Sequence, residues 1–375
     1  MKLLSVSGFF ESHGGGVEIV AGELARALGR FDHESCIAAA SFDPLPDDVM
    51  VEPVPLSSFD PIERKVGLPM PIPSTAGRRK LVREVQQADA IIIHDALYAS
   101  SLIAARAAQR AGKPWILIQH IGEIPFSNFA KRMLLTTANR IVTRRMLASA
   151  PQAIFISDIV REFFGSVQFS APPKLLFNGV DHSLFCRRSQ SDRLQIRNEC
   201  GFGNSKADIL FVGRYVEKKG VRVLRDIAAR MPDHTFHLVG SGPERPEKWR
   251  LSNVRVLGRK SRAELGSLYA AADALILPSA GEGFPLVIQE AMASGLPIVC
   301  GKESASADPG ARAFLHGVEV DLSKPSDTAA RFAAAIKSLP LGLNTDAAEY
   351  ASRAYDWDRN AQWILNRLAE LQNAQ

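Results

Sequence analysis

The chain has 375 residues, of which 46% are hydrophobic and 23% charged, and it carries a formal net charge of +5. This composition is typical of a folded globular protein and argues against extended disorder, and the length favours two domains over one. The mild positive charge suits an anionic ligand or surface, but aromatic residues are too sparse for a single-strand binder, so we expect no nucleic-acid partner.

Nothing in the sequence indicates a membrane-spanning or disulfide-bonded protein. No apolar run approaches the roughly eighteen residues of a spanning helix, and polar residues from Glu11 onward follow the first apolar stretch too soon for a signal peptide. The four cysteines are widely spaced and form no CxxC motif: Cys36, Cys186, Cys200 and Cys300. We therefore expect no zinc site and a cytoplasmic location, either soluble or peripheral at the cytoplasmic face of a membrane.

Expected strands and helices alternate from residue 1 to about residue 177. The strands are expected at 2–8, 35–41, 89–94, 115–119 and 152–156, and the helices at 17–29, 78–87, 98–111 and within 128–147. Strands separated by helices indicate a parallel sheet. Between Pro44 and Pro73, eight prolines interrupt the periodicity. That interval is expected to be a long ordered loop or lid, or else a variable surface excursion without a function.

The second half repeats the alternation, with strands expected at 208–212, 235–239, 254–257, 273–277 and 296–300. The polar, proline-containing segment between Pro172 and Ser191 separates the two series, so we expect domains at 1–180 and 181–356. A last helix is expected at about 357–373. It carries an apolar stripe at helical spacing and should pack on the first domain, through Ala361, Ile364, Leu365 and Leu368.

Glycine-rich turns follow two of the expected strands. Gly14–Gly16 stand between the first strand and the first helix, where the absence of a Cβ lets the backbone approach a phosphate. A dinucleotide-binding fingerprint is the competing interpretation, although Ile19 stands where that motif needs its third glycine. Gly240 and Gly242 follow the strand at 235–239. They suit a ribose-phosphate or base neighbour, or a plain tight turn.

Two basic residues after the strand at 208–212 are spaced to bind an anion. Arg214 stands in the turn at the end of that strand and Lys219 at the expected start of the next helix, so both can converge on one anion together with the helix N-terminus. A diphosphate would fit. A surface ion pair between Arg214 and Glu217 would explain the arginine equally well.

Glu282 and Glu290 bracket the turn and helix after the strand at 273–277. Open α/β sheets bind ligands outside the carboxyl ends of their strands. At this spacing both carboxylates can face one crevice and hold a neutral, hydroxyl-rich molecule. The alternative is an ordinary loop residue and a solvated helix residue.

Taken in this order, the motifs resemble those of the retaining GT-B glycosyltransferases of family 4. The stretches that carry the resemblance are Gly14–Glu18, Phe177–Asp181, Gly213-Arg214, Lys219-Gly220, Leu238–Pro243, Pro278-Ser279, Glu282–Pro285 and Glu290–Pro297. The resemblance covers nearly the whole chain. It implies an α/β fold of GT-B type, in which two Rossmann-like parallel-sheet domains face a central cleft and a C-terminal helix returns to the first domain.

The resemblance also implies a role for each motif. Arg214 and Lys219 would hold the donor's diphosphate, Glu290 the ribose and Glu282 the sugar hydroxyls. His120, after the strand at 115–119, would lie near the reacting carbon; a lone histidine is otherwise more often structural. The other donor-binding positions would be Gly15, Gly16, Gly213, Gly242, Gly283, Phe284, Pro285 and Leu286. In this family the leaving phosphate is thought to take the acceptor's proton, so no protein nucleophile is required.

The implied activity is transfer of a hexose from a UDP- or GDP-linked sugar to a glycan or lipid-linked acceptor, in cell-surface polysaccharide or glycolipid synthesis. The transfer would retain the anomeric configuration and use no cofactor and no metal. A GT-B nucleotide-sugar epimerase would need acid and base residues facing the sugar. A non-catalytic sugar-binding protein would lack the charged residues that hold the donor, and these are all present.

Three segments stand outside this assignment. Asp356-Trp357-Asp358 spells the DxD metal motif of another fold, but capping of the last helix by Asp358 is the better interpretation, so no metal is expected. Five basic residues between Lys131 and Arg145 suggest contact with the inner membrane surface, or a solvated helix. Residues 301–308 depart from the family's pattern, and we assign them no role.

Overall fold

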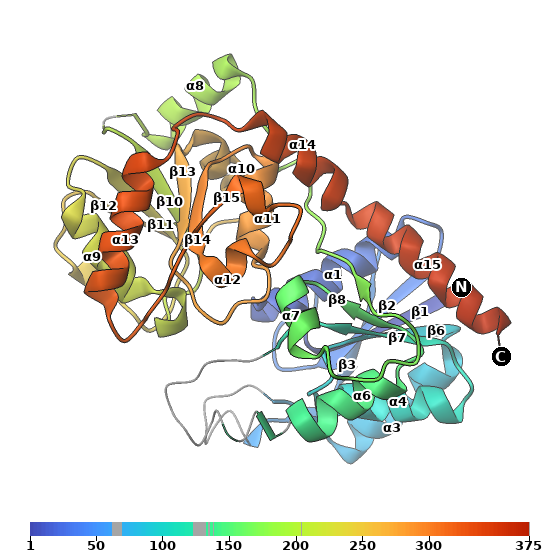
Figure 1. Cartoon of the computed structure of the whole chain (residues 1–375). Helices are drawn as coiled ribbons and strands as arrows, with labels where there is room; N and C mark the ends of the chain where they lie inside the picture. The colour runs from blue at the N-terminus through green and yellow to red at the C-terminus, as the bar shows by residue number, and fades with distance from the viewer. Residues whose placement is uncertain (62–69, 123–132, 134–135, 138, 204, 375) are drawn as a thin grey trace. The chain divides into compact units, whose positions relative to one another are not determined.

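The structure, a computed structural model, describes residues 1–61, 70–122, 133, 136–137, 139–203 and 205–374. The chain divides into two compact units. Unit 1 comprises Met1–Asn178 and Trp357–Gln375, and unit 2 comprises Gly179–Asp356. Each unit is built on one large parallel sheet with helices packed against it (Figure 1), which confirms the expected Rossmann-like α/β architecture.

The described strands of unit 1 form a seven-stranded sheet in the order β3-β2-β1-β6-β7-β8-β9, and every neighbouring pair is parallel. Their bounds are β1 Lys2–Phe9, β2 Glu34–Ala40, β3 Glu52–Leu56, β6 Ala90–His94, β7 Trp115–Gln119, β8 Ala153–Phe155 and β9 Lys174–Leu175. The strand order reverses between β1 and β6. Ligands of open α/β sheets bind beside the carboxyl ends of the strands at such a point.

Helices join these strands, and the last helix of the chain belongs to the same unit. Their bounds are η1 Glu11–His13, α1 Gly16–Gly29, α3 Thr75–Gln87, α4 Ala99–Arg110, η2 Asn139–Thr143, α6 Arg144–Ser149, α7 Asp158–Phe163 and α15 Trp357–Asn373. The helix expected within 128–147 falls partly outside the described residues; its described end is the π-helical η2 followed by α6.

Helix α15 packs against α1 through the apolar stripe that the sequence predicts. Ile364 and Leu368 are fully buried. Polar side chains at its rim fix the helix: Asn360 Nδ2 donates to the carbonyl of Phe177 at 2.7 Å, and Arg367 Nε donates to Gln152 Oε1 at 2.9 Å. The helix therefore docks on unit 1, although it follows unit 2 in the sequence.

The interval from Pro44 to Pro73 is not simply a loop, which corrects the expectation from its prolines. It contains β3, and a short antiparallel pair joins β4 Ser58–Phe59 to β5 Ile72–Pro73. Strand β3 lies at the edge of the main sheet, where proline is tolerated. The Leu56 carbonyl accepts from Ser41 N after β2, whereas the Pro55 carbonyl turns outward to Lys80 Nζ at 3.2 Å. Residues 62–69 of this interval lie outside the described residues.

Unit 2 has six described strands, in the order β12-β11-β10-β13-β14-β15, again all parallel. They are β10 Asp208–Val212, β11 Thr235–Val239, β12 Val254–Gly258, β13 Ala274–Leu277, β14 Ile298–Gly301 and β15 Leu315–Val318. The sequence did not predict β15. Its sequence, Leu-His-Gly-Val, is too short and has too few apolar residues to predict a strand. The strand forms because it pairs with β14, and such tertiary context often decides strand formation.

The helices of unit 2 connect these strands in turn. They are α8 Gln190–Cys200, η3 Glu217–Lys219, α9 Val221–Arg230, η4 Pro246–Lys248, α10 Arg262–Ala271, α11 Leu286–Ala293, α12 Lys302–Ala305, η5 Arg312–Phe314, α13 Pro325–Ser338 and α14 Thr345–Ala354. A capping box begins α10: Ser261 Oγ accepts from Glu264 N, and the Glu264 side chain accepts from Ser261 N. Such reciprocal bonds stabilise a helix start.

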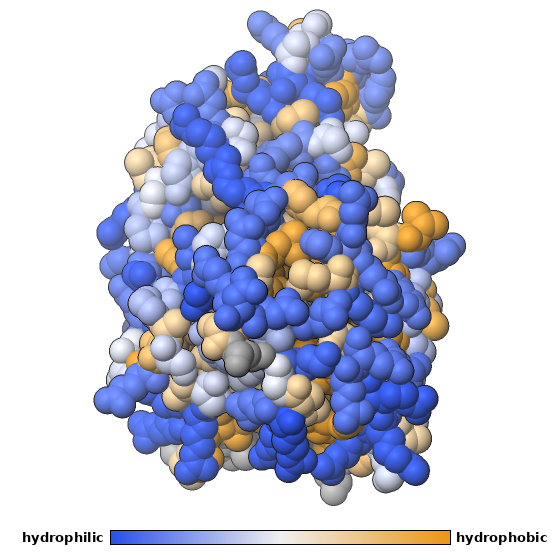
Figure 2. All heavy atoms as spheres, turned by 90° about the vertical axis from the view of Figure 1, so that its right-hand side faces the viewer, coloured by the Kyte–Doolittle hydropathy of each residue, from blue (hydrophilic) through white to orange (hydrophobic). Residues whose placement is uncertain are grey.

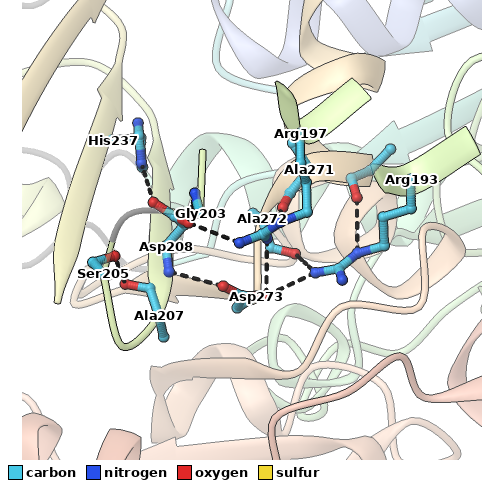
Figure 3. Close-up of polar contacts among 11 residues, drawn as sticks. Arg193, Arg197, Gly203, Ser205, Ala207, Asp208, His237, Ala271, Ala272 and Asp273 are labelled. Atoms are coloured by element: carbon cyan, nitrogen blue, oxygen red, sulfur yellow. Dashed lines mark hydrogen bonds and ion pairs between the residues drawn. The ribbon is translucent and has the colours of Figure 1, made fainter. Parts of the chain in front are cut away.

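A polar network ties α8 to the amino ends of β10 and β13, at the sheet edge opposite the strands' carboxyl ends (Figure 3). The buried Asp208 carboxylate accepts from His237 Nε2 at 2.8 Å and from Arg197 Nη2 at 2.9 Å. Arg193 and Arg197 of α8 also pair with Asp273. Burial raises the pKa of Asp208, but the His237 contact, a backbone N–H and the Arg197 charge outweigh it and lower that pKa below its usual value.

We expect Asp208→Asn to destabilise unit 2 by about 3 kcal/mol, because it removes one partner of a buried ion-pair network. Urea unfolding of parent and variant measures this difference. The folded-state pKa is lowered, so the stabilisation is fully present above the unfolded-state pKa of about 4 and is lost as the pH falls below it, through the lower folded-state pKa. Asp233→Asn is the matched control, since that exposed carboxylate also contacts a histidine. An equal effect of both substitutions would contradict the role of the network.

The described residues include no helix that combines the length and the hydropathy needed to cross a membrane. Hydrophilic side chains cover most of the face drawn in Figure 2, and the hydrophobic ones between them form separate groups. Several large apolar side chains of unit 1 are nevertheless exposed in the segment after β2, among them Phe42, Leu45 and Val49.

Candidate functional site

Most of the predicted donor-binding residues of unit 2 lie on loops that follow its strands, and Leu286 and Glu290 lie on α11. Gly213 and Arg214 follow β10, Gly240 and Gly242 follow β11, and Glu282 follows β13. Because β11, β10 and β13 are parallel neighbours, their carboxyl ends meet at the same edge. Residues far apart in the sequence are thereby brought together.

Lys218, Lys219 and Glu282 form what we call the lysine–glutamate cluster. Lys219 Nζ lies 3.0 Å from Glu282 Oε2, and Lys218 Nζ lies 3.6 Å from Oε1. The Glu282 side chain is only 13% exposed. Burial raises its pKa, but the charges of Lys219 and Lys218 outweigh burial and lower that pKa below its usual value. Glu282 is therefore ionised at neutral pH.

Positive charge exceeds negative charge at this cluster. Burial lowers the pKa of Lys218, Glu282 opposes that effect, and the charges of Lys219 and Arg214 reinforce it. Arg214 is exposed and has no ion-pair partner among the residues that the structure describes, so the alternative pairing with Glu217 is not seen. Two lysines and one arginine around a single carboxylate are suited to an anionic ligand.

The structure corrects the position of Lys219. It was expected at the start of a helix, but it is the last residue of the 3₁₀ turn η3, and α9 begins only at Val221. Gly220 lies between them with φ +69°, and a Cβ there would collide with the Pro278 carbonyl after β13. The Ala280 amide also donates to the Lys218 carbonyl at 3.0 Å. Close contact between the two loops thus sets the lysines against Glu282.

The glycines after β10 and β11 pack against each other. Gly213 N donates to the Val239 carbonyl at 3.0 Å, and Tyr215 N donates to the Ser241 carbonyl at 2.8 Å. A Cβ on Gly242 would collide with the Tyr215 carbonyl. This packing explains why residue 242 is a glycine: the loop after β11 can then lie directly against the loop that carries Arg214 and support it. Donor binding by Gly213 and Gly242 stays a prediction.

Glu290 lies on α11, in an environment different from that of Glu282. Tyr269 Oη donates to Glu290 Oε2 at 3.0 Å. Burial raises the pKa of Glu290, and this hydrogen bond and the charge of Arg262 oppose it only in part. Neither Tyr269 nor Arg262 was predicted from the sequence. The first carboxylate is thus held by cations and the second by a buried phenol.

The residues between the two glutamates are buried or half-buried. Phe284 is 3% exposed, and its ring packs edge-on against Tyr355 with centroids 5.7 Å apart. Pro285 is buried and Leu286, the first residue of α11, is half-buried. Donor binding by Gly283 and Phe284 stays a prediction.

The segment at 301–308, to which no role was assigned, supports the same turn. Glu303 of α12 accepts from Gly281 N at 3.0 Å. The carboxylate holds the residue directly before Glu282, although the family's pattern is absent from this part of the sequence. Ser279 Oγ, two residues earlier, is buried and has no hydrogen-bond partner among the described residues.

In unit 1, His120 directly follows β7 and is 4% exposed. Its Nε2 lies 3.2 Å from Nδ1 of His94, the last residue of the neighbouring strand β6. Burial lowers the pKa of His94 to about 3. Burial, and the repulsion that a second cationic ring beside His94 would create, likewise lower the pKa of His120 well below its usual value. Both imidazoles are neutral at physiological pH, and the sequence analysis had not identified His94.

Asp95, the residue after His94, is a second buried group that the sequence analysis missed. It has φ +65°, which is uncommon for a residue other than glycine. Its Oδ1 accepts from Gln119 Nε2 at 2.7 Å. Burial raises its pKa to about 7, against the opposing effect of Gln119. His94 and Asp95 are two polar residues directly after the apolar run Ala90–Ile93. This pattern is the signal in the sequence that could have identified both of them.

The glycines after β1 differ in what surrounds them. A Cβ on Gly15 would collide with the carboxylate of Glu18, whereas a Cβ on Gly16 would meet no atom within 4 Å. Glu18 is buried and raises the pKa of Tyr98 further than burial alone. Gly15 is thus explained by packing within unit 1. Gly16 is exposed, as its predicted approach to a phosphate requires.

The DxD stretch contains an aspartate that makes an ion pair, and the structure describes only part of the basic segment. Asp358 lies in the first turn of α15 and not at its cap, and it pairs with Arg30, the residue directly after α1. Among the described residues, the three metal-ligating side chains that lie close together are Glu34, Cys36 and Glu52. Lys131 and Arg132 lie outside the described residues, and membrane contact by this segment stays a prediction.

Comparison with known proteins places these motifs in a family. Residues 14–184 match the family described as Glycosyltransferase Family 4, and residues 206–340 match that described as Glycosyl transferases group 1. The phosphatidyl-myo-inositol mannosyltransferase of Mycobacterium tuberculosis is 30% identical over 263 residues, or 64% of this chain and 65% of that protein. D-inositol 3-phosphate glycosyltransferase of Corynebacterium kroppenstedtii is 30% identical over 213 residues, or 50% and 45%. The matches thus span 45% to 65% of these two relatives' lengths.

Solved structures share the fold over nearly the whole chain. Sucrose-phosphate synthase from Thermosynechococcus elongatus has a TM-score of 0.76 and 17% identity, with all of both chains covered. The Anabaena protein HepE in complex with UDP-glucose has a TM-score of 0.69 and 22% identity, with 99% of this chain and 100% of that chain covered. At 17% and 22% sequence identity, this structural similarity establishes the fold alone.

Proposed function

Because the chain is a GT-B glycosyltransferase of family 4, we propose that it transfers a hexose from a UDP- or GDP-linked sugar to a glycan or lipid-linked saccharide acceptor. The transfer retains the anomeric configuration, needs no metal, and serves cell-surface polysaccharide or glycolipid synthesis at the cytoplasmic face of the membrane. The observation that carries the proposal is the lysine–glutamate cluster beside Arg214, which has no ion-pair partner among the described residues, at the carboxyl edge of the unit 2 sheet.

The chemistry needs positive charge where this cluster lies. Breaking the bond between the sugar and a nucleoside diphosphate builds negative charge on the leaving phosphate. Arg214 and Lys219 offset that charge, and Lys218 adds to them; donors held in place beforehand stabilise such a transition state most effectively. In the free protein, Glu282 keeps both lysine ammonium groups in position. With the donor bound, it accepts hydrogen bonds from the sugar hydroxyls.

The proposal gives His120 the role that the resemblance implies, beside the reacting carbon. The sugar ring gains positive charge as the bond breaks. A cationic imidazole would oppose that charge, whereas a neutral one can stabilise it with a lone pair. The lowered pKa of His120 supports this assignment, because the side chain stays neutral at physiological pH.

A thermal-shift screen of the purified protein against UDP-, GDP- and ADP-linked sugars tests the proposed donor class. A donor at about a hundred times its dissociation constant adds roughly 2.7 kcal/mol to the free energy of unfolding. UDP-sugars are tested first, since HepE, which shares the fold, was solved with UDP-glucose. Absence of a shift with every nucleotide sugar would contradict the donor site.

The same donor then separates transfer from epimerisation. We expect the donor alone to be recovered unchanged, and the product formed with saccharide acceptors to keep the anomeric configuration of the donor. Proton NMR of the anomeric signals measures both. Conversion of the donor sugar to its epimer in the absence of acceptor would overturn the transferase assignment, and inverted product would overturn retention.

A further inference from the structure

The histidine pair, His94 and His120, joins the ends of two neighbouring strands of unit 1. His94 Nδ1 and His120 Nε2 are 3.2 Å apart, and the rings stack at a centroid distance of 5.4 Å. Both side chains are buried. Each outer nitrogen, Nε2 of His94 and Nδ1 of His120, is buried without a hydrogen-bond partner among the described residues. The contact between the inner nitrogens, Nδ1 of His94 and Nε2 of His120, therefore determines which nitrogen of each ring carries a proton.

The strand ends around the pair are locked together. Asp95 N donates to the Ile118 carbonyl at 2.8 Å, Gln119 Nε2 donates to Asp95 Oδ1 at 2.7 Å, and Ala96 N donates to Gln119 Oε1 at 3.2 Å. These bonds run from the residues after β6 to the end of β7. They tie together the strand ends that carry the two imidazoles, so the contact between the rings is supported by the surrounding sheet edge.

The pair is uncharged, because burial disfavours the charged form of both rings. Among the described residues, ionisable groups on the elements at this edge include Asp95 after β6, Glu18 on α1, Tyr98 before α4 and Asp158 on α7. Glu18 and Asp95 act on the Tyr98 hydroxyl, and Asp158 pairs with Arg161. Beside burial, the neighbouring His94 lowers the pKa of His120, because two cationic rings in contact would repel each other.

A neutral pair has two possible proton arrangements, because one inner nitrogen must donate and the other accept. In the first, His120 Nε2–H donates to His94 Nδ1, and both rings carry their proton on Nε2. In the second, His94 Nδ1–H donates, and both rings carry it on Nδ1. The neutral imidazole of histidine intrinsically favours the proton on Nε2. The first arrangement satisfies this preference in both rings.

We propose that His94 is a positioning residue, which accepts the Nε2–H of His120 and so holds a lone pair on His120 Nδ1. This inference rests on the proposed function, in which His120 lies beside the reacting carbon. A lone pair on its outer nitrogen stabilises positive charge on the sugar, whereas an N–H there opposes it. The hydrogen bond made by one ring nitrogen thus decides what the other offers.

Nitrogen NMR of the full chain with ¹⁵N-labelled histidine tests the assignment without donor or acceptor. The expected spectrum shows His120 neutral between pH 5.5 and 8, with a protonated Nε2 and an unprotonated Nδ1. His237, whose Nε2 faces Asp208 at 2.8 Å, is an internal reference in unit 2. A proton on Nδ1 of His120, or a cationic ring at pH 7, would overturn the proposal.

Two variants then test whether His94 is the cause. His94→Asn places an amide oxygen near the position of Nδ1 and should keep the His120 tautomer and most of the turnover. His94→Leu removes the acceptor at similar volume. It should give mixed His120 tautomers and lower kcat about tenfold, the scale of one lost hydrogen bond, with the donor KM unchanged. An unaltered tautomer in His94→Leu would sink the positioning role.

The readouts separate this inference from the proposed function. If the tautomer in His94→Leu changes and kcat does not, His94 positions His120 but the catalytic role of His120 fails. If His94→Leu does not fold, as far-UV circular dichroism would show, the tautomer of the parent and of His94→Asn decides: the Nε2–H form in both supports the proposal, and the Nδ1–H form in either overturns it.

Discussion

Lys219→Met should lower kcat by about 10²-fold or more, because it removes a preorganised positive charge from the leaving phosphate. Methionine keeps the length and the apolar stem of the side chain, so the substitution tests charge rather than packing. Arg214→Ala should have an effect of the same scale. Steady-state kinetics at saturating donor measure kcat directly, and a thermal unfolding scan confirms that each variant folds.

Substitutions of two further lysines, Lys260 and Lys218, provide comparisons for Lys219→Met. Lys260 pairs with Glu264 at 2.9 Å on the surface of unit 2, and Lys260→Met should leave kcat within about twofold of the parent, as expected for an exposed pair. Lys218→Met should fall between the two, since its ammonium lies farther from Glu282 than that of Lys219. Turnover of Lys219→Met within a few-fold of the parent would remove the cluster from the mechanism.

Glu282→Gln should weaken binding of the nucleotide sugar by about 10- to 10²-fold, the scale of a hydrogen bond to a charged group. Binding of the nucleoside diphosphate alone should stay unchanged or tighten, because the two lysines then lose the carboxylate that pairs with them. Calorimetric titration of both ligands measures the difference. The substitution thus separates recognition of the sugar from recognition of the nucleotide.

Glu290→Gln provides the matched comparison within the same helix–turn segment. Its proposed contact is the ribose, which the nucleoside diphosphate and the nucleotide sugar share, so both ligands should bind about tenfold more weakly. Tyr269, which donates to Glu290 at 3.0 Å, can still donate to an amide oxygen. Equal losses of sugar-specific binding in both variants would show that the two carboxylates do not have separate roles.

The sheets could be predicted because their strands are short, continuous apolar runs. Asp208–Val212 and Thr235–Val239 were predicted with the bounds that the structure gives, since a strand buried on both faces needs little alternation. Strand β3 was missed because Pro53 and Pro55 are poor strand residues in isolation. Only the position of this strand at the edge of the sheet makes them acceptable, and edge position is a property of the whole sheet.

The residue types of the donor site were predictable, but the contacts between them were not. Lys219 and Glu282 could each be placed at the end of a strand. Their distance of 3.0 Å depends on β10 and β13 being neighbours, and no local pattern encodes that strand order. Lys218 was missed because it adjoins the predicted lysine, and the 3₁₀ turn η3 brings both of them to the same carboxylate.

The histidine pair was missed for a related reason. His94 served in the sequence only to end an apolar run, and a histidine at a strand end has no signature of its own. The pairing of β6 with β7 brings it against His120. Such contacts between strands are where the structure adds most to the sequence.

A crystal structure of the protein with a bound nucleoside diphosphate, UDP or GDP as the screen selects, tests the central claim most directly. The cluster beside Arg214 should hold the diphosphate: a β-phosphate oxygen should lie within hydrogen-bond distance, about 3 Å, of Lys219 Nζ and of the Arg214 guanidinium. A diphosphate bound elsewhere, with the Lys219–Glu282 pair intact and Arg214 free of phosphate, would contradict the account.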